Sequence, residues 1–277
     1  MKEFILSNGR KIPSIGLGTF KLTNEEAYNS VLYALEAGYR LIDTAKIYKD
    51  EEGVGRAIAH SNIDRKDIYL ETKIWPTSFL DKEVIHKTLK RLGVTYLDLV
   101  LLHQPCGNYI EGYKLLEKAY KNQEIRAIGL SNFNIEEIKQ ILSICSVKPV
   151  LLQVENHPFC QNKELKEFCE KNGIILQSWF PFGGKGNNAV LENEVINKIA
   201  KKYNKNASQI VLRWNIENGY IPVPGSRSKE HIIENFDIFN FSLSKEDLKE
   251  LDNLNKEEPF HKRSEEAFKR YLTVKVD

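Results

Sequence analysis

The sequence predicts an α/β fold of the (β/α)8 barrel class, the TIM barrel architecture, and three observations lead to that prediction. Eight short runs rich in leucine and β-branched residues follow one another along the chain, separated by segments with helical periodicity. The runs are apolar throughout rather than alternating, as expected for parallel strands covered by helices. Eight such units within about 250 residues are typical of a closed barrel.

The predicted elements can be placed in order. The strands are expected within residues 14–20, 40–45, 68–74, 97–104, 127–132, 151–156, 174–180 and 221–226. The helices are expected at 24–37, 51–61, 81–92, 111–121, 135–144, 162–171, 191–203, 207–218 and 229–236, with extra helices near the C-terminus. Helix starts are predicted at Thr23, Asp81 and Ser208, which carry capping side chains. Helix ends are predicted at Gly38, Gly93, Gly173 and Gly219.

A β-hairpin is predicted ahead of the first barrel strand. Residues 4–13 read FILSNGRKIP, and Asn8-Gly9 signals a two-residue turn. Such a hairpin would close one end of the barrel.

A doubly wound nucleotide-binding sheet is the competing fold, and it would carry GxGxxG after its first strand. The motif GLGTF lacks the third glycine, and GVGRAI falls inside a predicted helix. The whole chain, 1–277, is therefore interpreted as a single barrel domain.

The composition excludes several functional classes. The 277 residues carry 40 Lys and Arg against 38 Asp and Glu, so the net charge is only +2, with both signs scattered. We therefore expect neither a nucleic-acid nor a membrane partner. The N-terminus has a three-residue apolar stretch, too short for a signal peptide, and four cysteines without CxxC predict reduced thiols. The expected location is the cytoplasm.

The reactive groups of such a barrel collect where strands end and the following loops begin. Asp43, Lys73 and His103 end three successive predicted strands, and Tyr48 follows shortly after Asp43. The other polar residues at these ends are Thr19, Ser131, Asn132, Gln153, Asn156, Ser178 and Ser226. We therefore expect an aspartate, a tyrosine, a lysine and a histidine to converge on one rim.

These four side chains suit one kind of chemistry. A lysine ammonium near Tyr48 would lower the high pKa of the phenol, and Asp43 would keep Lys73 charged and oriented. His103 could orient a carbonyl oxygen. The set predicts protonation of a forming alkoxide, which means carbonyl reduction by hydride transfer.

The sequence also bears on two other kinds of site, a metal site and a phosphate site. Metal catalysis is the rival for a rim with His and Asp, but the six histidines form no HxH or HxxxH pair, so no metal is expected. A phosphate site is expected at residues 221–236, where Ser226, Arg227, Ser228 and Lys229 precede a helix.

Together these motifs resemble the aldo-keto reductases, most closely small prokaryotic-type members such as 2,5-diketo-gluconate reductases and glyoxal reductases. The resemblance is carried by GYRLIDTAKIYKDEEGVGRAI, LETKIWPT, LDLVLLHQP, IRAIGLSNF, LLQVENHPF, QSWFPFGGKG and IPVPGSRSKEHIIENFDIF. It covers residues 4 to 255. It implies a nicotinamide cofactor bound across the barrel mouth and a small carbonyl substrate.

The resemblance also implies roles for individual residues. Asp43, Tyr48, Lys73 and His103 would form the catalytic tetrad, with Tyr48 as general acid. The residues expected to bind the cofactor are Thr19, Asp43, Ser131, Asn132, Gln153, Trp179, Ser226, Arg227, His231, Glu234 and Asn235. Phe20, Tyr48, Trp75 and His103 would contact the substrate.

The chain departs from the family pattern at three places. Gln104 stands where many relatives have tryptophan, which would remove an aromatic wall from the pocket. Asp50 replaces a common asparagine, and its carboxylate would disfavour anionic substrates. Gly225 and His231 replace a lysine and an arginine that grip the adenosine 2′-phosphate, although Arg227 and Lys229 could substitute for them. The expected cofactor is NADPH, with NADH use possible.

The sequence thus predicts a monomeric cytosolic reductase of small aldehydes or ketones. The alternative is a nicotinamide-binding subunit or sensor, which would fit a damaged tetrad better than the intact one found here. The C-terminal segment from Glu257 is expected to fold over the barrel mouth.

Overall fold

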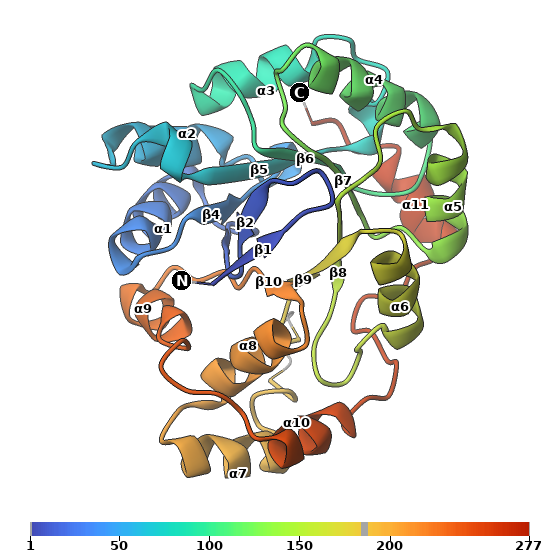
Figure 1. Cartoon of the computed structure of the whole chain (residues 1–277). Coiled ribbons are helices and arrows are strands. Elements are labelled where there is room, and N and C mark those ends of the chain that lie inside the picture. Colours follow the sequence, from blue (N-terminus) through green and yellow to red (C-terminus); the bar gives the residue numbers. More distant parts are fainter. Residues whose placement is uncertain (1, 184–187, 277) are drawn as a thin grey trace.

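The structure is a computed structural model that describes residues 2–183 and 188–276, and it contains a barrel of eight parallel strands (Figure 1). The strands are β3 (Leu17–Gly18), β4 (Leu41–Asp43), β5 (Tyr69–Ile74), β6 (Leu99–Leu102), β7 (Ile128–Ser131), β8 (Leu151–Glu155), β9 (Ile175–Trp179) and β10 (Ile221–Pro222). Each pairs in parallel with the next, from β3 to β10. Two hydrogen bonds then join the first edge to the last, from Gly16 N to Pro222 O (3.0 Å) and from Gly18 N to Pro224 O (3.1 Å). The predicted (β/α)8 class is confirmed.

Helices surround the strands and complete the α/β repeat. They are α1 (Asn24–Ala37), α2 (Glu51–His60), α3 (Val84–Leu92), α4 (Tyr109–Lys121), α5 (Ile135–Ile144), α6 (Lys163–Lys171), α7 (Glu194–Tyr203), α8 (Ala207–Glu217) and α9 (Lys229–Phe236). The predicted extra helices near the C-terminus are α10 (Lys245–Asp252) and α11 (Glu265–Tyr271). Three short 3-10 turns, η1 (Lys46–Tyr48), η2 (Arg65–Asp67) and η3 (Pro76–Ser78), lie in loops between these elements.

Of the three predicted helix starts, one is confirmed and two are wrong. Thr23 caps α1 with both bonds of a capping box, because its hydroxyl and the Glu26 side chain each accept a main-chain N–H. Asp81 lies in a preceding turn and accepts from Glu83 N (3.0 Å), so α3 begins three residues later than expected. Asn206 rather than Ser208 caps α8.

The predicted helix ends are confirmed in position. Gly38 and Gly93 are the capping residues of α1 and α3, and both take the left-handed backbone conformation. Gly173 and Gly219 also have positive φ and lie one residue beyond the caps of α6 and α8.

The predicted N-terminal hairpin is present, but its turn differs. β1 (Glu3–Ile5) and β2 (Lys11–Pro13) pair antiparallel. Leu6 N donates to Arg10 O (2.8 Å) and Gly9 N donates to Leu6 O (2.8 Å), so the loop has three residues, with Gly9 at φ 80°. Leu6 and Ile12 are buried in the cluster that fills the barrel interior, so the hairpin closes one end.

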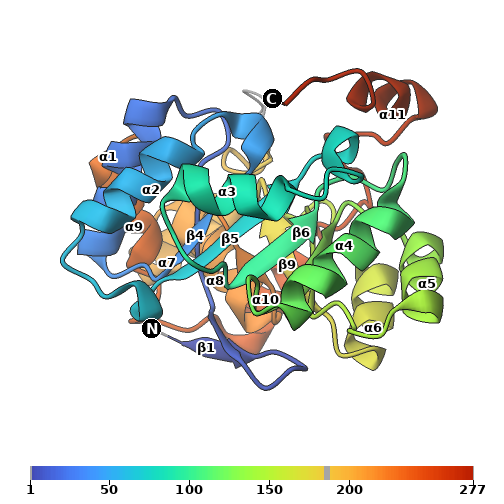
Figure 2. The ribbon, with the colours of Figure 1, turned by 90° about the horizontal axis from the view of Figure 1, so that it is seen from above.

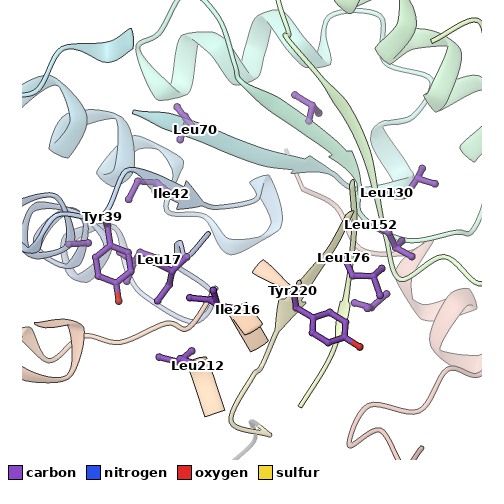
Figure 3. Close-up of a cluster of buried hydrophobic side chains, with 14 of the residues drawn as sticks. Leu17, Tyr39, Ile42, Leu70, Leu130, Leu152, Leu176, Leu212, Ile216 and Tyr220 are labelled. Carbon is purple, nitrogen blue, oxygen red and sulfur yellow. The ribbon is translucent and has the colours of Figure 1, made fainter. Parts of the chain in front are cut away.

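Apolar side chains occupy both faces of the strands. Figure 3 shows Leu17, Ile42, Leu70, Leu130, Leu152 and Leu176 from six strands in the buried cluster that includes Tyr39, Leu212, Ile216 and Tyr220 from the surrounding segments. Leu41, Leu99, Leu101, Leu151 and Ile221 point the other way and pack with the hairpin in the lower barrel. This double burial explains why the strands read as continuous apolar runs.

The C-terminal segment lies at the end of the barrel opposite the hairpin. Figure 2 shows β1 and α11 on opposite sides of the strands. Trp75 Nε1 donates to Tyr271 O (2.9 Å) and Thr77 Oγ1 to Val274 O (3.0 Å). The expectation that this segment folds over the barrel mouth is confirmed.

Among the described residues, no helix combines the length and apolar character needed to cross a bilayer.

Candidate active site

A cleft of about 540 Å³ opens where the strands end. Its lining includes Asp43, Tyr48, Trp75, His103 and Trp179 from the predicted site. A smaller cleft, of about 280 Å³, lies at the outer surface between α6 and α8. Only the larger cleft coincides with the predicted chemistry, and it is the candidate active site.

Asp43 and Lys73 form an ion pair at the floor of this cleft. Lys73 Nζ lies 2.5 Å from Asp43 Oδ1 and also donates to Thr44 O (3.0 Å). Asp43 and Lys73 are 3% and 1% exposed. Strands β4 and β5 are neighbours, and both residues face the barrel interior, so the sequence pattern alone brings the pair together.

Tyr48 and His103 complete the predicted group of four. The turn η1 carries Tyr48 above the ion pair, with Lys73 Nζ 5.0 Å from the centre of its ring. The ring of His103 approaches Tyr48 edge-on, with 5.8 Å between ring centres. Phe20 packs on the other side of Tyr48, at 5.0 Å. All four residues therefore meet at one point of the cleft.

Burial changes the proton affinities of these groups. Burial raises the pKa of Tyr48 to about 12, although the charge of Lys73 acts in the opposite direction. The expectation that Lys73 would bring the pKa of Tyr48 below its ordinary value is therefore wrong for the protein alone, because desolvation outweighs the ammonium. Tyr48 is a protonated phenol at neutral pH.

The pKa values of the other two bases also shift. Burial, the largest single influence, would lower the pKa of Lys73. The attraction of Asp43, its hydrogen bond to Lys73 and the smaller effects of Tyr48 and Glu71 together outweigh burial, so the net shift is upward. Burial and the nearby charge of Lys73 both hold the pKa of His103 well below its usual value. The site thus combines a charged lysine with a neutral histidine.

Side-chain hydrogen bonds hold the residues expected to bind a nicotinamide in two separate sets. Trp179 Nε1 donates to Asn132 Oδ1 (3.0 Å), and Asn132 Nδ2 donates to Ser131 Oγ (3.1 Å). Gln153 Nε2 donates to Asp43 Oδ1 (3.2 Å). Because its N–H is already engaged, the Trp179 indole is fixed as part of the cleft wall. The last residues of the motif QSWFPFGGKG, 184–186, lie outside the described residues.

The structure places the remaining cofactor candidates differently. Ser226 and Arg227 line the cleft. Thr19 has no exposed surface and donates to Asp43 O (3.3 Å), so it supports the floor from behind. His231 and Glu234 are exposed on α9, Asn235 is buried there, and none of the three lines the cleft.

The two cations expected near the phosphate site are both paired. Arg227 lies 3.0 Å from Glu26, and Lys229 lies 3.0 Å from Glu36, both carboxylates belonging to α1. Arg227 lines the cleft but Lys229 does not. The structure therefore brings one of the two expected substitutes to the cleft.

Phe20, Tyr48, Trp75 and His103, the residues expected to contact the substrate, all line the cleft, and Gln104 lines it with them. The part that sequence reasoning missed is the opposite wall. It comes from the C-terminal segment and comprises His261, Lys262, Arg263, Ala267, Phe268 and Tyr271. The only signal in the sequence is a set of aromatic residues in an otherwise polar segment.

Asp50 does not lie where its expected effect requires. Its side chain has no exposed surface and does not line the cleft, and Oδ1 accepts a hydrogen bond from Thr44 Oγ1 (2.6 Å). The expectation that this carboxylate faces substrates is wrong. Burial raises the pKa of Asp50 to about 6.

The residues present fit a nicotinamide dinucleotide better than a metal. Gln153, Trp179, Ser226 and Arg227, from the ends of several strands, line one continuous cleft of about 540 Å³, which suits an extended ligand. Within 2–183 and 188–276, no three His, Cys, Asp or Glu side chains gather in a way that could hold a metal ion.

Comparison with known proteins agrees with this geometry. The model of the Aldo/keto reductase family matches residues 14–256. Glyoxal reductase of Bacillus subtilis is 43% identical over 91% of this chain and 92% of its own length. Methylglyoxal reductase DkgA of Escherichia coli is 37% identical over 90% and 92%.

Solved structures give the same result. An aldo-keto reductase from a deep-sea metagenome library, MGS-M4, superposes with a TM-score of 0.90 at 40% identity, covering 93% of this chain and 96% of that one. The aldo-keto reductase of Bombyx mori in complex with NADP has a TM-score of 0.88 at 32% identity, covering 94% and 95%. The chain therefore belongs to the aldo/keto reductase family of oxidoreductases.

Proposed function

We propose that this protein reduces small aldehydes and ketones to alcohols, with NADPH as hydride donor and Tyr48 as proton donor. We further propose that it acts as a single-domain monomer, 1–277, in the cytoplasm. The observation that supports the reaction most directly is the meeting of Tyr48, His103 and the Asp43–Lys73 pair at one point of the cleft.

Tyr48 holds the proton that the product alcohol requires. Its raised pKa keeps the phenol protonated over the whole physiological range. As negative charge develops on the carbonyl oxygen, Tyr48 Oη transfers its proton to that oxygen. Lys73 stabilises the phenolate that results, and Asp43 keeps Lys73 charged while it does so.

His103 and the cleft wall orient the carbonyl. The depressed pKa of His103 makes it a neutral imidazole, which can donate a hydrogen bond without competing as an acid. Phe20, Trp75 and Gln104 border the same space. Aromatic walls around one polar point favour a small carbonyl compound that points its oxygen at Tyr48 and His103.

The residues that would bind the cofactor lie mainly along the same cleft. NADPH, when bound, supplies the hydride for the carbonyl carbon. Ser131, Asn132 and Gln153 would hold its carboxamide and Trp179 would stack on its ring, while Ser226 and Arg227 would receive the adenosine phosphate. His231, Glu234 and Asn235 would approach only the outer edge of the adenosine.

Cofactor preference depends on Arg227 in this proposal. Gly225 supplies no cation, and Lys229 is held by Glu36 away from the cleft. One guanidinium, already paired with Glu26, supports a preference for NADPH while leaving NADH usable. The names of the glyoxal and methylglyoxal reductases suggest small 2-oxoaldehydes as the first substrates to try.

The test is the loss of reduced-cofactor absorbance with methylglyoxal or a nitrobenzaldehyde, using NADPH and NADH in parallel. Tyr48→Phe should lose turnover by about three orders of magnitude or more while its cofactor affinity stays close to wild type. The matched control is Tyr28→Phe on α1, whose hydroxyl contacts His60 at the surface. Ordinary turnover by Tyr48→Phe would overturn the assignment, and cofactor binding without consumption by the wild type would favour a sensor.

A further inference from the structure

Glu71 is a fully buried acid that the proposed chemistry does not use. It lies on β5, two residues before Lys73, so both side chains point into the barrel. In the strand register Glu71 is the direct partner of Asp43 on β4. Side chains of paired residues point to the same face, so two carboxyl groups lie side by side beneath the cleft floor.

The hydrogen bonds around this pair of acids are incomplete. Asp43 Oδ1 accepts from Lys73 Nζ (2.5 Å) and from Gln153 Nε2 (3.2 Å). Gln153 Nε2 also donates to Gln177 Oε1 (2.5 Å) on β9, which leaves Gln177 Nε2 facing elsewhere. Within the described part of the chain, Gln177 Nε2 and both oxygens of Glu71 are buried without a hydrogen-bond partner. Buried polar atoms without partners are rare, and three in one layer need an explanation.

Charge repulsion makes an ionised Glu71 unfavourable. Lys73 is already paired with Asp43, and a second carboxylate beside Asp43 would be buried without a counter-ion of its own. Burial, followed by repulsion from Asp43, raises the pKa of Glu71 well above its ordinary value, although Lys73 opposes this. Tyr69, which shares this face of β5 with Glu71 and Lys73, also stays neutral because burial raises its pKa.

We infer that Glu71 is a neutral carboxylic acid that donates its proton in a hydrogen bond to Asp43, and that it is a positioning residue for the Asp43–Lys73 pair. With one proton on Glu71, each of the three buried atoms without a partner gains a hydrogen bond. The Glu71 hydroxyl donates to Asp43, and the Glu71 carbonyl oxygen accepts from Gln177 Nε2. The result is a closed ring of Asp43, Gln153, Gln177 and Glu71, contributed by β4, β8, β9 and β5.

The ring matters for the proton donor. A hydrogen bond from Glu71 spreads the negative charge of Asp43, so more of the field of Lys73 acts on Tyr48. An ionised Glu71 would do the opposite, since a second negative charge near Lys73 would make the phenol harder to deprotonate. This consequence depends on the proposed role of Tyr48, but the protonation state of Glu71 can be measured without turnover.

The first experiment is infrared spectroscopy of the full chain at pH 8. The wild type should show the carbonyl stretch of a protonated carboxyl group, and labelling all glutamates with ¹³C at the side-chain carboxyl should shift that band. Glu71→Gln should remove it. The matched control is Asp50→Asn, another buried acid near the tetrad, which should keep the band because the pKa of Asp50 is about 6. Absence of the band at pH 8, or a band that the glutamate label does not move, would overturn the inference. The labelled wild type decides this even if a variant fails to fold.

The second experiment measures the positioning role through the pH profile of kcat/KM. Glu71→Gln removes no charge if Glu71 is neutral, so the pKa of the alkaline limb should stay within about 0.3 of wild type. If Glu71 is ionised, that pKa should instead fall by about one unit, which would contradict the inference.

Glu71→Leu supplies the complementary variant, since it keeps the volume and loses the donor. Glu71→Leu should lower kcat by about tenfold and shift the pKa of the alkaline limb. Glu71→Gln should retain most of the wild-type kcat. A Glu71→Leu enzyme with the wild-type rate and profile would remove the positioning role. If the wild type shows no turnover at all, the proposed function fails while the infrared result still stands.

Discussion

Lys73 Nζ lies 2.5 Å from Asp43 Oδ1 in a site from which solvent is almost completely excluded. Removing one partner of such a pair leaves the other charge buried and uncompensated. Asp43→Asn should therefore lower the pKa of Lys73 and reduce kcat by about a hundredfold. It should also cost about 3–5 kcal/mol of the free energy of unfolding. Steady-state kinetics and denaturant titration measure both, and unchanged values for both would contradict the role of the pair.

Asp50 should make the protein less stable as pH rises. Its folded pKa of about 6 lies above the ordinary aspartate value of 3.8, so the folded state binds its proton more tightly than the unfolded state. The penalty is absent below pH 3.8 and develops fully above pH 6. Asp50→Asn should therefore raise the free energy of unfolding by about 1–3 kcal/mol at pH 7.5 and hardly at pH 4. Thermal melts at the two pH values test this, and an equal change at both would argue against burial of the charge.

Arg227 and Lys229 should differ in their effect on cofactor choice. Arg227→Ala removes the guanidinium that lines the cleft and should weaken NADPH binding by about tenfold while sparing NADH. Lys229→Ala is the matched control, because Lys229 pairs with Glu36 outside the cleft. Titration of intrinsic fluorescence with each cofactor gives the dissociation constants. A larger loss for Lys229→Ala would mean that Lys229 reorients towards the phosphate.

Glu155 should hold the C-terminal wall of the cleft in place. Its carboxylate accepts from the main-chain N–H groups of Phe260 (2.7 Å) and His261 (2.9 Å), and His261 packs against Trp179 at 5.0 Å. Glu155→Gln leaves one acceptor, so limited proteolysis after residue 255 should quicken and KM for carbonyl substrates should rise about threefold or more. Glu167→Gln is the control, since Glu167 pairs with Lys171 on the exposed face of α6 and contacts no residue of the C-terminal wall.

Glu155 should also make the folded protein less stable at low pH. Burial alone would raise the pKa of Glu155, but hydrogen bonds from His157, His261 and Phe260 outweigh it and lower the pKa to about 2. The stabilisation is therefore present above pH 4.5 and is lost as pH falls towards 2. Wild type and Glu155→Gln should differ in melting temperature at pH 7 and converge as the pH approaches 2. A constant difference would show that Glu155 is not ionised in the folded protein.

Much of the barrel could be predicted because its information is local. Runs such as LDLVLL, the cap at Thr23 and the glycines after helices each determine nearby backbone, and eight repeats of the pattern imply closure. Asp43, Lys73 and His103 converge because strand ends in one barrel share a rim, which needs no side-chain detail. The error at Ser208 arose because Asn206, two residues earlier, is also a capping residue and forms the cap. At Asp81 the side chain accepts a hydrogen bond within the turn before α3 and leaves the helix start uncapped.

What the sequence did not predict depends on distant contacts. The sequence predicts that the C-terminal segment covers the barrel mouth, but not that residues within 261–271 form a wall of the cleft. They approach Trp75 and Trp179 only through folding of the whole chain. The balance of burial and charge on Tyr48 has the same origin, because desolvation is a property of the surroundings and not of the motif. The burial of Asp50 and of Glu71 likewise appears only in three dimensions.

The hairpin at the base of the barrel closes that end to substrate and cofactor. Leu6 and Ile12 pack beneath the side chains that fill the barrel interior, so every reactant must enter and every product must leave through the cleft at the opposite end. A dinucleotide lying from Trp179 to Arg227 would occupy the inner part of the cleft, and a carbonyl compound would bind above it. Catalysis should then follow a compulsory sequence in which the nucleotide arrives first and departs last.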